Sequence, residues 1–125
     1  MDKTIFALIP IKFNSTRVPG KNFRLMNGKP LFYYIINTLL KSKYITKIII
    51  NIDNKFTEDS IKKYFPSGID FYYRPKHLEG GHIATNKLFI DMIDTLKLNA
   101  DYYFQTHTTN PLLKLETIDK AIYQF

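Results

Sequence analysis

The sequence contains no cysteine, which excludes disulfide bridges and thiolate metal sites and suits a reducing compartment. No apolar run approaches the ~20 residues that a membrane-spanning helix needs. The first residues, MDKTIFALIPIKF, are apolar too briefly for a signal peptide, contain Pro10 and lack a small-residue cleavage site. The sequence therefore predicts a cytoplasmic protein that does not associate with membranes.

Acidic residues are absent from residues 3–52, although this stretch holds nine lysines and arginines. Residues 53–125 combine nine basic residues with ten acidic ones, so the excess behind the net charge of +7 lies in the first two-fifths of the chain. Such a positive field attracts polyanions: free nucleotides, nucleic acids or an anionic surface. Lysine-rich coding bias is the alternative explanation, because charge governs association and not fold.

The 125 residues suit one domain, and the 45% hydrophobic and 15% aromatic content excludes a disordered or collagen-like chain. Short β-rich runs alternate with segments of helical periodicity. The predicted strands are residues 5–9, 47–52, 69–73 and 102–105. The predicted helices are residues 31–39, with Pro30 at the first helical position, 58–64, 86–98 and 118–125. This alternation predicts a three-layer αβα sandwich around a mostly parallel sheet.

The chain ends at Phe125 inside a predicted helix, without a capping glycine or a polar tail. Open α/β sheets of nucleotide enzymes commonly have more strands than the four predicted here. We therefore expect residues 1–125 to form a single α/β domain that is the N-terminal part of something longer.

The segment IPIKFNSTRVPGKN, which follows the first predicted strand, holds Lys12, Arg17 and Lys21 with no acid among them. In an α/β sheet, ligands bind beyond the carboxyl ends of the strands. The polar turn that includes Asn14 and Ser15 can present backbone N–H groups to phosphate oxygens. The arginine can bind two phosphate oxygens, and the lysines act as point charges. The segment matches neither the Walker A nor the GxGxxG pattern, and an ordinary solvated loop is the alternative.

Four segments resemble, in the same order, the cytidylyltransferases that activate 2-keto sugar acids, the acylneuraminate (CMP-sialic acid) and CMP-Kdo synthetases. These segments are ALIPIKFNSTRVPGKNFRLMNGKPL, KSKYITKIIINIDN, YYRPKHLEGGH and THTTNPLLKLETIDKAI. Together they cover almost the whole chain. The resemblance implies a nucleotide-diphospho-sugar transferase fold and a site for CTP.

The resemblance also implies roles for individual residues. Lys21 and Asn22, with Arg17, are expected to contact the triphosphate and sugar of CTP. Lys12 stands where the family usually has arginine, so the charge is kept but the bidentate geometry is not. Arg74 stands where relatives have an arginine that faces the base or the phosphates.

Two further segments carry expected nucleotide contacts. Residues 81–85, which include His82 and Thr85, match a stretch that lines the cytosine pocket; the alternative for His82 is an ordinary loop histidine. Thr109 and Asn110 stand where the Kdo branch has aspartate and glutamate. No carboxylate remains there to hold magnesium, so the resemblance favours the sialic-acid branch.

The resemblance implies Mg²⁺ as cofactor, with its main carboxylate ligands outside this chain, and a possible homodimer formed through that missing half. Asp53 is a weak metal candidate, with ribose binding or helix capping as alternatives. His107 is a candidate general base, because imidazole beside a sugar hydroxyl suits that role, or a hydrogen-bonding residue at a strand end.

The predicted reaction is attack by the anomeric hydroxyl of a 2-keto sugar acid on the α-phosphate of CTP, with pyrophosphate as leaving group. CTP and an acidic sugar are therefore the predicted partners. One alternative is a truncated, catalytically inactive nucleotide-binding module. Another is a basic nucleic-acid-binding protein, which the clustering of cations in one phosphate-sized loop disfavours.

Overall fold

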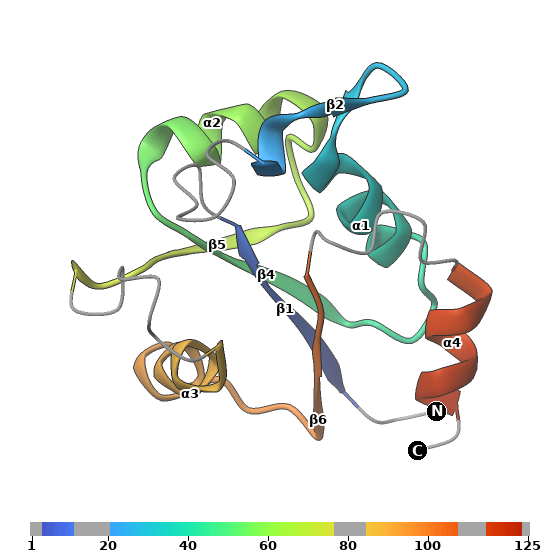
Figure 1. The fold of residues 1–125 in the computed structure, drawn as a ribbon. Coiled ribbons are helices and arrows are strands. Elements are labelled where there is room, and N and C mark those ends of the chain that lie inside the picture. The colour runs from blue at the N-terminus through green and yellow to red at the C-terminus, as the bar shows by residue number, and fades with distance from the viewer. Residues whose placement is uncertain (1–3, 12–20, 77–84, 108–114, 124–125) are drawn as a thin grey trace.

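The computed structural model describes residues 4–11, 21–76, 85–107 and 115–123 (Figure 1). The strands in chain order are β1 (Ile5–Ile11), β2 (Leu25–Met26), β3 (Lys29–Pro30), β4 (Lys47–Ile52), β5 (Asp70–Tyr73) and β6 (Tyr102–Gln105). The helices are the 3-10 helix η1 (Lys21–Phe23), α1 (Leu31–Leu40), α2 (Lys55–Tyr64), α3 (Thr85–Thr95) and α4 (Leu115–Tyr123).

Four strands form a parallel sheet in the order β5-β4-β1-β6. In its register, Leu8 of β1 lies opposite Ile49 of β4 and Gln105 of β6. β4 also pairs in parallel with β5. The crossovers between these strands run through helices, as parallel connections require. The predicted mostly parallel sheet is confirmed.

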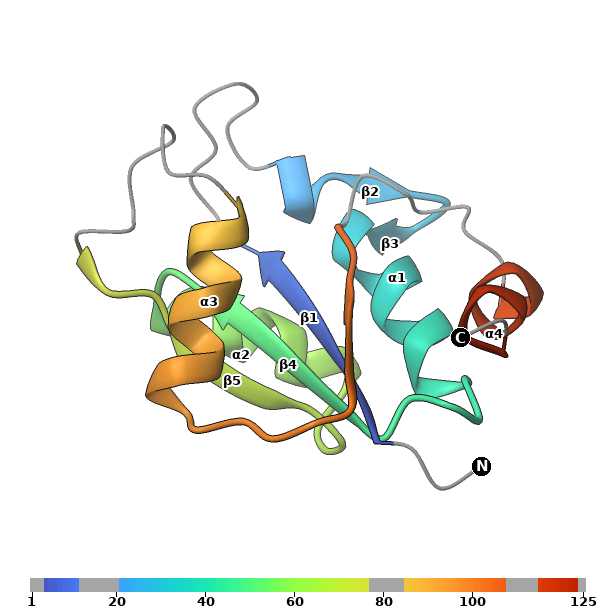
Figure 2. The same ribbon diagram turned by 90° about the horizontal axis from the view of Figure 1, so that it is seen from below.

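Helices cover both faces of the sheet, as Figures 1 and 2 show. On one face α1, α2 and α4 bury the alternate residues Ile48, Ile50 and Ile52 of β4. On the other face α3 packs its Phe89 and Met92 on a cluster that includes Leu8 and Ile49. β4 is apolar on both faces because helices lie on both. The predicted three-layer sandwich is therefore confirmed.

The predicted helix boundaries differ from the observed ones at both ends: α3 ends at Thr95 and not at residue 98, and α4 begins at Leu115 and not at residue 118. α2 begins at Lys55 and not at residue 58, because the Asn54 side chain caps it by accepting a hydrogen bond from the Thr57 N–H at 2.9 Å. Pro30 precedes the first helical residue of α1, with φ of −64° and ψ of 152°, and does not occupy the first helical position. The differences at α1 and α2 concern the local capping geometry and leave the core faces as predicted.

The sequence analysis did not predict the hairpin of β2 and β3. Its two-residue turn places Asn27 at φ 54° and Gly28 at φ 81°, both in the left-handed region. The Leu31 N–H then donates to the Arg24 carbonyl at 2.9 Å, so the chain turns directly from the hairpin into α1. No helix in the described ranges is long and apolar enough to cross a membrane.

Candidate functional site

The carboxyl ends of four parallel strands define the edge where a ligand of this fold class binds. β1, β4, β5 and β6 end along this edge, at Ile11, Ile52, Tyr73 and Gln105. Asp53 and Arg74 follow β4 and β5 directly, and His107 comes two residues after β6. The topology therefore brings three residues singled out in the sequence to one side of the molecule.

Most residues of the predicted phosphate-binding turn lie outside the described residues. Several predicted nucleotide-binding residues in two later loops also lie outside the described residues. The structure therefore does not place the following predicted site residues: Lys12, Asn14, Ser15, Arg17, His82, Thr109 and Asn110. The backbone of Lys21 opens η1, and that of Thr85 opens α3. The convergence of Lys12, Arg17 and Lys21 on one hollow remains a prediction.

Aromatic packing places η1 at the strand-end edge. The ring of Phe23 lies 5.4 Å from that of Phe32 in α1 and 5.8 Å from that of Phe56 in the first turn of α2. α2 starts where β4 ends, so the contact with Phe56 holds η1 over the carboxyl end of β4. Asn22, the middle residue of η1, is 4% exposed. The backbone of Lys21 and Asn22 is thereby placed near the carboxyl end of β4, and their contacts with a nucleotide remain a prediction.

Arg74 is buried beside a strand and bonded to a second buried polar residue. Its Nε donates to Oδ1 of Asn51 at 2.7 Å, and its backbone N–H extends the sheet by donating to the Ile52 carbonyl at 2.8 Å. Asn51 is fully buried, and Arg74 is 7% exposed. A guanidinium held in a fixed orientation at the end of β5 suits recognition of hydrogen-bond acceptors on a ligand.

The sequence analysis missed Asn51. Its register partners are Pro10 of β1 and Tyr72 of β5, and Tyr72 packs with the cluster on the α3 face. Asn51 Nδ2 is buried and has no hydrogen-bond partner in the described part of the chain. The sequence signal for Asn51 was a polar residue inside the apolar run KIIINI. A buried amide side chain is costly unless it has hydrogen-bond partners.

Asp53 takes part in the start of α2. Its Oδ1 accepts a hydrogen bond from the Thr57 hydroxyl at 2.8 Å, next to the Asn54 cap. Among the described residues, no three histidine or acidic side chains lie close enough to hold a metal ion. The Asp53 carboxylate thus supports the start of α2 through a side-chain bond to Thr57, while Asn54 caps the helix, and a metal or ribose role for Asp53 remains a prediction.

His107 is exposed just beyond the end of β6. Its ring centroid lies 6.5 Å from that of Phe89, which is four residues after the start of α3. The preceding Thr106 continues the sheet, because its N–H donates to the Leu8 carbonyl at 3.2 Å. These contacts bring the strand-end histidine to the N-terminal half of α3.

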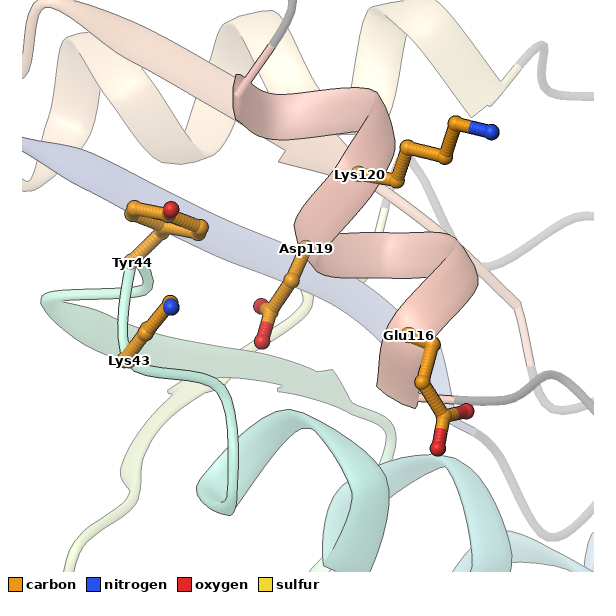
Figure 3. Close-up of a pocket in the computed structure, with 5 residues that line it drawn as sticks. All are labelled: Lys43, Tyr44, Glu116, Asp119 and Lys120. Atoms are coloured by element: carbon orange, nitrogen blue, oxygen red, sulfur yellow. The ribbon is translucent and has the colours of Figure 1, made fainter.

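A concave region lies away from the strand-end edge, at the amino end of β4. It is an open hollow of about 370 Å³ lined by Lys43, Tyr44, Glu116, Asp119 and Lys120. Glu116 and Lys120 point in different directions (Figure 3), and Asp119 Oδ1 accepts a hydrogen bond from the Ser42 hydroxyl. This hollow lies between α4 and the loop after α1, and its lining side chains do not converge as catalytic groups would.

The sheet order, the covering helices and the polar strand-end edge define an α/β protein of the nucleotidyltransferase fold. A solved structure of CMP:2-keto-3-deoxy-manno-octonic acid synthetase complexed with CTP superposes with a TM-score of 0.78 at 18% identity, over 98% of this chain and 47% of that one. The profile of the cytidylyltransferase family matches residues 6–125. The chain belongs to the cytidylyltransferase family, and the predicted family is confirmed.

Two curated relatives share most of this chain. The CMP-N,N'-diacetyllegionaminic acid synthase of Legionella pneumophila is 31% identical over 122 residues, covering 94% of this chain and 51% of its own length. The 3-deoxy-manno-octulosonate cytidylyltransferase of Pelobacter propionicus is 28% identical over 118 residues, covering 94% of this chain and 43% of its own length. The chain therefore spans about half the length of these relatives.

Proposed function

We propose that this chain forms the CTP-binding part of a cytidylyltransferase that transfers CMP to a 2-keto sugar acid and releases pyrophosphate. The observation that carries this proposal is the family match over residues 6–125. The strand-end edge supports it, because η1 and the Arg74–Asn51 pair lie where a nucleotide binds in sheets of this class.

In this proposal the protein accelerates the reaction by positioning the two substrates and by stabilising the negative charge on the phosphates. The anomeric hydroxyl loses its proton to a base, for which His107 is the candidate, or to solvent, and its oxygen attacks the α-phosphorus. The bond between the α-phosphorus and the oxygen that bridges it to the β-phosphate breaks, and pyrophosphate leaves with that oxygen. Developing negative charge is stabilised by fixed cations, for which Lys12, Arg17 and Lys21 are the proposed groups. The family resemblance implies magnesium with its main ligands outside this chain, and no step here depends on it.

The proposed acceptor is a sugar acid of the sialic-acid type. The basis is the sequence HTTNP, in which Thr109 and Asn110 stand where the Kdo branch has two acids. Both curated relatives have names that pair a cytidylyl or CMP group with an acid, which agrees with the acidic class of acceptor.

The direct experiment measures pyrophosphate release from CTP with N-acetylneuraminic acid or 3-deoxy-manno-octulosonate as acceptor. We expect release with the former to exceed release with the latter. CTP binding without any release would instead favour a nucleotide-binding module that lacks activity. Absence of CTP binding would overturn the proposal, and salt-sensitive binding to RNA in its place would favour a nucleic-acid-binding protein.

A further inference from the structure

The two polar atoms of the buried Asn51 side chain differ in their hydrogen bonding within the described part of the chain. Its Oδ1 accepts from Arg74 Nε at 2.7 Å, while Nδ2 has no partner within the described residues. A buried amide donor without a partner costs roughly 1–3 kcal/mol. Native proteins retain such groups rarely, and each requires an explanation such as a bound water, an ion or a role at a functional site.

The position of Asn51 associates it with the ligand edge. It is the penultimate residue of β4, beside Pro10 of β1 and Tyr72 of β5 in the register of the sheet. Arg74 follows β5 directly, so the amide and the guanidinium lie together near the carboxyl ends of adjacent strands. Ile48, Ile50 and Ile52 of the same strand face the helices of the opposite layer.

We infer that Asn51 is a nucleotide-recognition residue with two functions, an inference that rests on the proposed CTP site. Its Oδ1 holds the Arg74 side chain in position. Its Nδ2 donates a hydrogen bond to an acceptor atom of the nucleotide. Cytosine (O2 and N3) and the triphosphate oxygens both offer such acceptors, and the experiment distinguishes these two sources.

Two substitutions separate recognition from folding. Asn51→Asp keeps an oxygen that accepts from Arg74 and removes the Nδ2 donor. Asn51→Leu has a similar volume and removes both polar atoms. The aspartate variant should have a Tm equal to or above that of the wild type, because a carboxylate beside Arg74 forms a charge-assisted hydrogen bond.

Calorimetry with CTP provides the functional measurement. We expect both variants to bind CTP about tenfold more weakly or worse, the loss that corresponds to one hydrogen bond. Asn54→Asp is the matched control for added charge, because aspartate caps α2 equally well three residues away. Its CTP affinity should fall by no more than about twofold at 0.15 M salt, since surface charges are screened.

Binding measurements with cytidine and with inorganic triphosphate, for the wild type and Asn51→Asp, identify the nucleotide group that accepts the hydrogen bond from Nδ2. A loss of affinity for cytidine alone assigns Nδ2 to the base, and a loss for triphosphate alone assigns it to the phosphates. Wild-type affinity for CTP in a folded Asn51→Asp protein would overturn the inference and leave the proposed function intact. A wild-type chain that does not bind CTP would overturn the proposed function itself.

Discussion

Phe23 of η1 packs edge to face on Phe32 of α1, with ring centroids 5.4 Å apart and an interplanar angle of 76°. Phe32 is fully buried in the main core, so this contact joins the end of the basic segment to the rigid part of the fold. The adjacent Asn22 is also buried. A core contact thus positions a residue that is expected to contact the nucleotide.

Phe23→Ala should therefore affect both stability and binding. We expect the free energy of unfolding to fall by about 2 kcal/mol, less than for a fully buried phenylalanine, because Phe23 is only partly buried. Chemical denaturation measures this loss. CTP affinity should also fall under conditions where the variant is folded, whereas Phe23→Leu should retain most of both. A destabilised variant with unchanged CTP affinity would show that η1 packing does not position the site.

Lys21→Ala should abolish CTP binding, because the cation at the start of η1 is proposed to neutralise the triphosphate. Calorimetry with CTP is the measurement. Lys41→Ala is the matched control, since Lys41 is an exposed lysine of the same acid-free stretch, at the end of α1. Unchanged affinity in Lys21→Ala would reject this role.

Glu58 in α2 should make stability depend on pH in the acidic range. Hydrogen bonds from Lys62 and then Tyr73 lower the pKa of Glu58 from 4.5 to about 2. As the pH falls, the Glu58 carboxylate takes up its proton first in the unfolded chain. The contribution of Glu58 to the free energy of unfolding is therefore fully present above pH 4.5 and is lost between pH 4.5 and about 2. Thermal unfolding of Glu58→Gln should therefore show a smaller decrease of Tm over this range than the wild type.

Glu116→Gln is the control for that measurement, because it removes an exposed carboxylate from α4, far along the chain from the Glu58 network. It should retain the wild-type decrease of Tm. An identical pH dependence in Glu58→Gln and the wild type would contradict the predicted linkage.

Gly28→Ala tests the hairpin between β2 and β3. A Cβ at this position would meet no atom within 4 Å, so the cost comes from the backbone φ of 81° alone. We expect a loss of about 1 kcal/mol in the free energy of unfolding, measured by chemical denaturation. Asn27→Gly, at φ 54°, should be close to neutral by comparison. A neutral Gly28→Ala would indicate that the turn relaxes to another type.

Hydrophobic periodicity was sufficient to predict the layers of this protein. Runs such as KIIINI have the two-sided apolar character of a strand between helices, and β4 occupies the predicted residues. The helix starts and the β2–β3 hairpin were harder to predict from the sequence. Side-chain caps and left-handed turns depend on a few local hydrogen bonds and dihedral angles. The Asn27-Gly28 pair was the signal for the hairpin.

The sequence by itself determined the fold class, the family and the surplus of cations at the first strand end, because these follow from periodicity, motif order and charge. Only the tertiary structure decided that Asn51 meets Arg74, 23 residues later in the chain, and that Phe23 fastens η1 to two helices. Such contacts depend on the register between strands and on packing between layers. Sequence spacing does not encode them directly, since residues on different strands become neighbours only when the sheet is assembled.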